Sequence, residues 1–245
     1  MQFSETGRKA TKEGIKGGEQ NSPVCLHEVE SMSREEKIRY SRFKLGDNNA
    51  IEDFARQIFA RISEEVGVQI STNPEDWVLV GGPFLEPKNC IYYLCDILVN
   101  ELGITRVTIN RKRYKGPALY SQSSLDVKRK ISQETLYFDG SVSVKGKNVI
   151  FVDDCLASGG IYGRSRGLLL ENGAKSVRAY IITRINNPVV YPEIDLDRTV
   201  VTEGGVEEIL NILKGSRNVI TSRLITVLSM LAEKDIVYLV NKLNK

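Results

Sequence analysis

The chain has 245 residues, of which 41% are hydrophobic and 27% charged, with a formal net charge of +3. This composition is that of a globular protein and excludes disordered, collagenous and membrane classes. A surplus of three positive charges is too small to indicate a nucleic-acid or anionic-membrane partner, so neither is expected.

Metal and histidine chemistry is limited by the residue types present. His27 is the only histidine, and the four cysteines contain no CxxC pair. A structural zinc site and a histidine-based catalytic triad are therefore not expected. No apolar run reaches the ~20 residues of a membrane span, and the first twenty residues lack the apolar core of a secretory signal. We expect a cytoplasmic protein with reduced cysteines.

The N-terminal third is predicted to contain a tail and two helices. Residues 1–30 are polar and aperiodic and predict a flexible tail, with a single domain over residues 31–245. A short helix is expected after the capping residue Ser33. A longer one begins at Asp47 or Asn48, where apolar residues follow three-and-four spacing, and is expected to end at Gly67.

The middle of the chain alternates between strand and helix patterns. The apolar run Trp77–Val80 predicts a buried strand that leads into a tight loop at Gly81, Gly82 and Pro83. A helix over about 88–101 and a strand at Ile104–Ile109 follow. Weaker patterns predict a partial helix over 120–131 and short strands at 136–138 and 141–144.

The clearest buried strand is Val149–Val152. A glycine-containing turn, a helix to Glu171 closed by Gly173, and a strand at Val177–Thr183 come next, which predicts a βαβ unit in a parallel sheet. Two or three helices are expected near the C-terminus, around 206–213, 222–231 and 235–243. They are interpreted as a packed cap or a contact in a homodimer.

The residues around that strand suggest a two-part binding site. Asp153 and Asp154 follow the strand, and Ser158, Gly159 and Gly160 precede the helix. Glycines and the free N–H groups of a first helical turn form a phosphate cradle. Two adjacent carboxylates would repel that phosphate and suit hydroxyl groups or a hydrated metal. We expect solvated carboxylates and a ligand with a phosphate at one end and hydroxyls in its middle.

The segment VIFVDDCLASGG resembles the phosphoribosyl-pyrophosphate (PRPP) signature of the type I phosphoribosyltransferases. The resemblance covers about residues 47–184. It implies an α/β, three-layer fold with a central, mostly parallel twisted sheet, a small variable hood and extra terminal helices. It also implies that Asp153 and Asp154 are catalytic, binding the ribose hydroxyls and, through water, Mg²⁺. The 5′-phosphate would lie on Ala157, Ser158, Gly159, Gly160 and Ile161.

The same resemblance assigns the remaining candidates. A pyrophosphate-binding loop would consist of Gly81, Gly82 and Pro83, with Lys88 nearby. A mobile basic loop would add Arg111 and Lys112 to the pyrophosphate site and Arg113 and Arg129 as catalytic residues. A surface charge is the alternative interpretation of each of these cations, and their clustering favours function.

Two departures from the family pattern bear on the substrate. Ile161 stands where many members have threonine, and Ala157 stands where purine-salvage members have aspartate, which argues against a 6-oxopurine acceptor. The predicted function is transfer of the phosphoribosyl group from Mg-PRPP to a small nitrogenous acceptor, with release of pyrophosphate. The alternative is a non-catalytic module that senses PRPP or a nucleotide.

Two other motif assignments fail on context. Residues 195–200 match a haloacid-dehalogenase pattern, but Pro192 interrupts the strand that this pattern requires. A dinucleotide-binding site is rejected because the acidic pair precedes the glycines instead of following them by ~20 residues.

Overall fold

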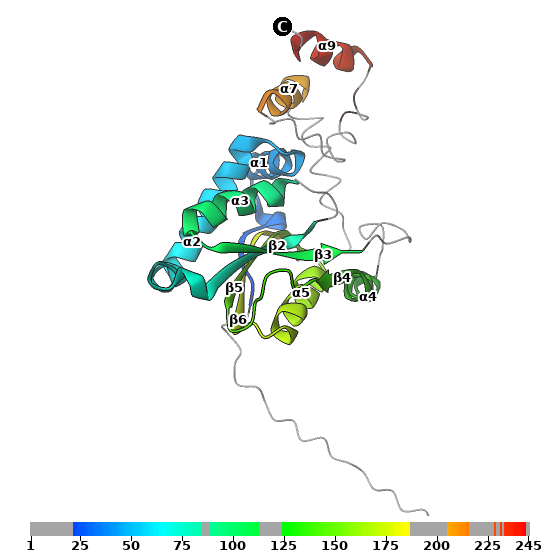
Figure 1. Cartoon of the computed structure of the whole chain (residues 1–245). Helices are drawn as coiled ribbons and strands as arrows, with labels where there is room; N and C mark the ends of the chain where they lie inside the picture. The colour runs from blue at the N-terminus through cyan, green and yellow to red at the C-terminus, as the bar shows by residue number, and fades with distance from the viewer. Residues whose placement is uncertain are drawn as a thin grey trace, which may run out of the picture.

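The central element of the computed structural model is the long strand β5 (Asn148–Leu156), which lies inside a six-stranded sheet (Figure 1). The structure describes residues 22–84, 89–112, 124–186, 205–215, 228, 231 and 233–243. The other strands are β1 (Val24–Glu28), β2 (Trp77–Phe84), β3 (Thr105–Arg111), β4 (Leu136–Phe138) and β6 (Ser176–Arg184).

The strand order is β1-β6-β5-β2-β3-β4, and every pairing is parallel except that of β3 with β4. The helices are α1 (Arg34–Leu45), α2 (Asn48–Thr72), α3 (Cys90–Leu102), α4 (Leu125–Thr135), α5 (Gly160–Glu171), α7 (Gly205–Gly215) and α9 (Glu233–Leu243). Short 3-10 turns occupy Val29–Ser31 and Pro74–Asp76. The predicted α/β class with a mostly parallel sheet is confirmed.

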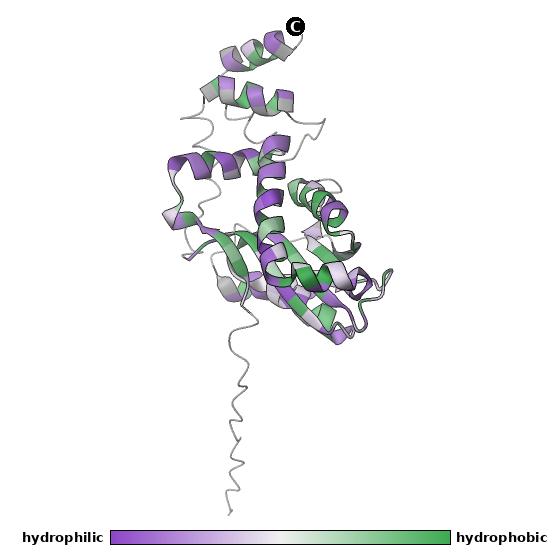
Figure 2. Ribbon diagram, turned by 90° about the vertical axis from the view of Figure 1, so that its left-hand side faces the viewer, coloured by the Kyte–Doolittle hydropathy of each residue, from purple (hydrophilic) through white to green (hydrophobic). Residues whose placement is uncertain are grey.

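Two hydrophobic cores lie on opposite faces of the sheet. Helices α1, α2 and α3 cover one face, whose core includes Leu79 and Ile150, while α5 covers the other, with Val80 and Phe151. Neighbouring residues of one strand thus serve different cores, as the alternation of side chains along a strand requires. The strands are largely hydrophobic in Figure 2, which is expected of parallel strands buried on both faces. The result is a three-layer arrangement.

Local capping explains how α1 and α2 follow one another so closely. Ser33 and Glu36 form a reciprocal capping box at the start of α1. Gly46, at φ 92°, ends α1 in the left-handed conformation, and the Asp47 side chain then caps α2 by accepting the Ala50 N–H at 2.9 Å. Both predicted helix starts are confirmed.

Four sequence-based boundaries need correction. Helix α2 continues through Gly67, because the buried spacing extends to Ile70 and outweighs the modest helix cost of one glycine. Val24–Glu28, placed in the predicted tail, instead pairs with β6 as an edge strand. Strand β2 includes Gly81 and Gly82, which were expected in a tight loop. Residues 141–144 form no strand.

Helices α7 and α9 share a small core with the C-terminal end of α1. Ile209, Leu210 and Leu239 are buried around Leu45. The predicted helices at 206–213 and 235–243 are confirmed, while most of the one expected at 222–231 lies outside the described residues. None of the described helices combines the length and the apolarity needed to span a bilayer.

Candidate functional site

The acidic pair lies near the carboxyl end of β5, with β2 on one side and β6 on the other. Asp153 pairs in register with Ile181 of β6, and the strand continues as far as Leu156. The pair thus lies in the terminal part of the strand, as predicted, and the strand extends two residues beyond it. Carboxyl ends of parallel strands are where ligands bind in open α/β sheets.

Asp153 is buried, with 8% of its surface exposed, which contradicts the expected solvated carboxylate. Its Oδ1 accepts the backbone N–H of Asp154 at 2.9 Å. Burial, followed by the neighbouring charge of Asp154, raises the pKa of Asp153 well above its ordinary value. The physical reason for the correction is the continuation of β5, which keeps Asp153 between neighbouring strands.

Gly82 of β2 makes room for this carboxylate. A Cβ atom at Gly82 would lie 2.4 Å from Oδ1 and 2.7 Å from Cγ of Asp153, both closer than real atoms approach. Gly82, which was predicted to belong to a pyrophosphate-binding loop, thus lies directly against the side chain of Asp153. Pro83 follows Gly82 in the same strand and is half-buried.

Asp154 has a cation partner that the sequence did not indicate. Its carboxylate forms an ion pair with Lys44 of α1, and the two side chains are only 16% and 15% exposed. Its backbone carbonyl accepts the Thr183 hydroxyl at 2.9 Å and the Tyr40 hydroxyl at 3.4 Å. Asp154 is therefore turned toward α1 and β6 and is not solvated as predicted, because α1 supplies a charge partner at its site.

Arg111, at the end of β3, interacts electrostatically with the carboxylate of Asp153. Among the described residues, its Nε and Nη2 are buried and have no hydrogen-bond partner. Burial lowers the pKa of Arg111, while the charge of Asp153 opposes that shift. Lys112, predicted for the same role, is exposed, and its Nζ lies 5.5 Å from the centre of the Tyr137 ring. Of these two predicted residues, Arg111 is thus the one placed to act with the acidic pair.

The predicted phosphate loop leads directly into α5. Gly159 has φ 70° and precedes the helix without a side-chain cap, while the Ser158 hydroxyl accepts the Gly160 N–H at 3.3 Å. Ala157 is exposed. Ile161 packs its side chain against the hydrophobic core on the α5 face, so it offers a ligand only its backbone. The first N–H groups of any α-helix have no intrahelical acceptor, which suits an anion.

Helix α4 packs against this loop through Arg129. A Cβ at Gly160 would lie 3.0 Å from Arg129 Cα, and Arg129 Nε donates to the Ser158 carbonyl at 3.2 Å. Its Nη1 lies 3.5 Å from Asp126. Arg129 therefore adjoins the loop and contacts its backbone, but it belongs to helix α4 and not to the mobile basic loop in which it was expected.

The structure brings together the carboxylates, Gly82, Arg111 and the Ser158-Gly159-Gly160 loop with Arg129, whereas Lys88 and Arg113 lie outside the described residues. Lys44, Tyr40 and Thr183 were missed by the sequence analysis. Within the part of the chain that is described, no group of three or more His, Cys, Asp or Glu side chains forms a metal site. Two carboxylates, one of them paired with Lys44, fit Mg²⁺ held through its water shell and do not fit a dehydrated ion.

Comparison with known proteins gives partial structural likenesses. No protein-family model matches the sequence, and no curated protein matches it. Phosphoribosylpyrophosphate synthetase from Mycobacterium smegmatis aligns over 60% of this chain and 37% of its own, with 20% identity and a TM-score of 0.35. The present chain thus spans little more than a third of that synthetase.

Two transferases give similar values. Adenine phosphoribosyltransferase from Saccharomyces cerevisiae aligns over 62% of this chain and 75% of its own, with 14% identity and a TM-score of 0.37. For the hypoxanthine-guanine phosphoribosyltransferase of L. donovani the coverage is 56% and 70%, with 15% identity and a TM-score of 0.39. These likenesses cover only part of each chain, at low sequence identity.

Proposed function

We propose that the chain binds Mg-PRPP at the carboxyl end of β5 and transfers its phosphoribosyl group to a small nitrogenous acceptor, releasing pyrophosphate. One observation carries this proposal. The buried Asp153 and the mostly buried Asp154 lie beside a glycine turn that opens onto the first turn of α5. Carboxylates that accept hydroxyls and a turn that donates N–H groups are complementary to a sugar phosphate.

Each end of the ligand meets groups of suitable charge. The turn from Ser158 to Ile161 would hold the 5′-phosphate, with Arg129 fixing the loop from α4. The carboxylates would accept the ribose hydroxyls. Arg111, whose buried Nε and Nη2 have no partner among the described residues, would donate to the pyrophosphate beside Gly82. A buried cation stabilises a departing anion more strongly than a solvated one does.

Mg²⁺, when bound through water to the acidic pair, would neutralise part of the pyrophosphate charge. The protein's contribution is to orient the sugar and exclude water from its anomeric carbon. The bond from that carbon to the pyrophosphate oxygen breaks, and a bond to the acceptor nitrogen forms. With alanine at position 157, the chain lacks the aspartate that purine-salvage members carry there, so the proposed acceptor is not a 6-oxopurine.

A second function, sensing of PRPP or a nucleotide without turnover, is favoured by the ion pair of Lys44 with Asp154. This pair occupies a carboxylate that a catalytic site would present to the sugar. The Ser158 hydroxyl is similarly engaged with the Gly160 N–H. A ligand would have to replace these internal contacts, which lowers its affinity.

The test compares the wild-type protein with the Asp153→Asn/Asp154→Asn double variant. Calorimetry with Mg-PRPP measures binding, and pyrophosphate release over a panel of nitrogenous bases measures transfer. We expect the double variant to lose both activities and Glu101→Gln, an exposed acid on α3, to retain them. Wild-type binding and release by the double variant would refute the site. Binding by the wild type without release for any base would select the sensing function.

A further inference from the structure

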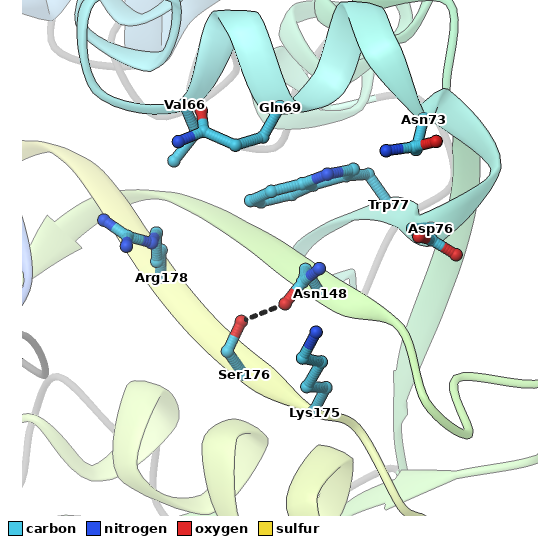
Figure 3. Close-up of a pocket in the computed structure, with 9 residues that line it drawn as sticks. All are labelled: Val66, Gln69, Asn73, Asp76, Trp77, Asn148, Lys175, Ser176 and Arg178. Atoms are coloured by element: carbon cyan, nitrogen blue, oxygen red, sulfur yellow. Dashed lines mark hydrogen bonds between the residues drawn. The ribbon is translucent and has the colours of Figure 1, made fainter.

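A pocket of about 300 Å³ lies at the opposite, amino end of the sheet from the acidic pair. Its floor is a row of three residues that begin neighbouring strands. Trp77 of β2 pairs in register with Asn148 of β5, and Asn148 pairs with Ser176 of β6. The last turns of α2 form its other wall (Figure 3). The pocket is thus built by elements with fixed relative positions. Its volume is near the lower end of the range for small-molecule sites, which is about 300–1,000 Å³.

The lining is polar around a single aromatic residue. Trp77, the only tryptophan of the chain, is buried with 6% exposed, and its indole lies between α2 and the strands in Figure 3. Carboxamides come from Gln69 of α2, from Asn73 at its C-cap and from Asn148 of β5, and the Ser176 hydroxyl donates to Asn148 at 2.8 Å. The complete lining is Val66, Gln69, Asn73, Asp76, Trp77, Asn148, Lys175, Ser176 and Arg178.

Several of these groups have hydrogen-bonding capacity to spare. Within the described residues, the side chains of Gln69, Asn73 and Lys175 make no hydrogen bond or ion pair with the protein. Carboxamides offer both donors and acceptors. The pocket therefore suits a polar body with both donors and acceptors, and it does not suit an apolar molecule.

Two cations of the lining are available to an anion. Lys175 and Arg178 are matched in number by Asp76 in the lining and Glu65 beside Arg178, so the pocket has no net charge, but its cations are only loosely paired. The nearest acid to Arg178 is Glu65, whose Oε2 lies 3.9 Å from its Nη1 and also accepts the Tyr180 hydroxyl at 3.0 Å. This long contact leaves the guanidinium able to bind a phosphate.

We propose that this pocket binds a nucleoside monophosphate, with its phosphate at Lys175 and Arg178 and its base or sugar at the carboxamides and Ser176. In Figure 3 these cations and the Gln69 and Asn73 side chains border the same space around Trp77. The site is separate from the acidic pair, because Asn148 and Asp153 are five residues apart on β5, roughly 16 Å at about 3.3 Å per residue. The proposal is therefore independent of the proposed transferase function.

The test uses the sole tryptophan as a reporter at the site. Wild-type protein is titrated with four nucleoside 5′-monophosphates, with the corresponding nucleosides and with inorganic phosphate, and both Trp77 fluorescence and calorimetric heat are recorded. We expect saturable binding of at least one nucleotide, at least tenfold tighter than its nucleoside or phosphate alone. Absence of heat and of fluorescence change for all four nucleotides overturns the proposal.

Variants locate the bound nucleotide. Lys175→Gln and Arg178→Gln should each weaken binding at least fivefold, while Arg56→Gln, an exposed arginine elsewhere on α2, should leave it unchanged. The Asp153→Asn/Asp154→Asn variant should bind the nucleotide as the wild type does. If binding is lost in that variant and retained in Lys175→Gln and Arg178→Gln, the nucleotide lies at the carboxyl end and the proposed pocket does not bind it. Circular dichroism checks that each variant is folded.

Discussion

The two ends of the same parallel sheet differ in how their polar groups are accommodated. At the carboxyl end, two adjacent carboxylates are buried or nearly so, and a buried guanidinium has unsatisfied nitrogens. At the amino end, the polar groups are mostly exposed or neutral. Burying charge costs stability that exposed amides do not. The carboxyl end is therefore less stable than it could be but holds preorganised charge, which is typical of functional sites.

The first prediction concerns the space that Gly82 of β2 leaves for the Asp153 carboxylate. Gly82→Ala places a Cβ 2.4 Å from Oδ1, so the carboxylate or the strand must move. We expect a loss of about 1–3 kcal/mol in the free energy of unfolding, as for other overpacked sites. PRPP binding should be abolished as well. Chemical denaturation and calorimetry measure the two effects.

Two further variants separate this clash from a general effect of losing a glycine. Gly67→Ala makes the same change inside α2, where the nearest contact is an ordinary 3.5 Å, and should stabilise the protein by about 0.5–1 kcal/mol. Adding Asp153→Gly to Gly82→Ala should restore stability without restoring binding. If Gly82→Ala is as stable as the wild type, a side chain at position 82 does not clash with the Asp153 carboxylate.

A second prediction concerns the cation that balances Asp154. Lys44→Gln leaves a mostly buried carboxylate without its charge partner, so the free energy of unfolding should fall by about 1–3 kcal/mol. Added Mg²⁺ should recover part of this loss, because the freed carboxylate becomes available to it. Thermal unfolding with and without Mg²⁺ measures both changes.

The matched control is Arg61→Gln, which breaks an exposed pair with Glu64. Exposed pairs contribute about 0–1 kcal/mol, so this variant should lose less than Lys44→Gln and gain nothing from Mg²⁺. Equal losses in the two variants would mean that the Lys44 pair is an ordinary surface contact.

Features that depend on local sequence were predicted, whereas contacts between distant residues were not. The β5 strand, the α5 helix and the closeness of the glycine turn to the acids were predicted, because each depends on a local apolar run or on neighbours in the chain. The contact of Lys44 with Asp154 joins residues 110 positions apart and leaves no local pattern. Edge strand β1 was missed for a related reason, since its half-buried residues show no clear alternation.

A third prediction tests the raised pKa of Asp153. A carboxyl whose pKa is higher in the folded state than in the unfolded state stabilises the fold at low pH, and that contribution is lost as pH rises through the folded pKa. Asp153→Asn should therefore match the wild type at acidic pH and become more stable than it as pH rises. The gain should be less than burial alone predicts, because Arg111 loses a nearby anion. A gain that does not change with pH would mean that Asp153 is not the titrating group.

The last prediction concerns the amino end, where the polar groups are mostly exposed or neutral and a substitution should therefore cost little stability. Ser176→Ala removes the 2.8 Å hydrogen bond to Asn148, and a half-buried neutral bond contributes about 0.5–1.5 kcal/mol. The released Asn148 amide can turn to a ligand or to water, so the loss should lie near the lower limit. Nucleotide binding should weaken far less than in Arg178→Gln, since no charge is removed. A loss as large as that of Lys44→Gln would show that this end also holds its polar groups under strain, and the distinction between the two ends would fail.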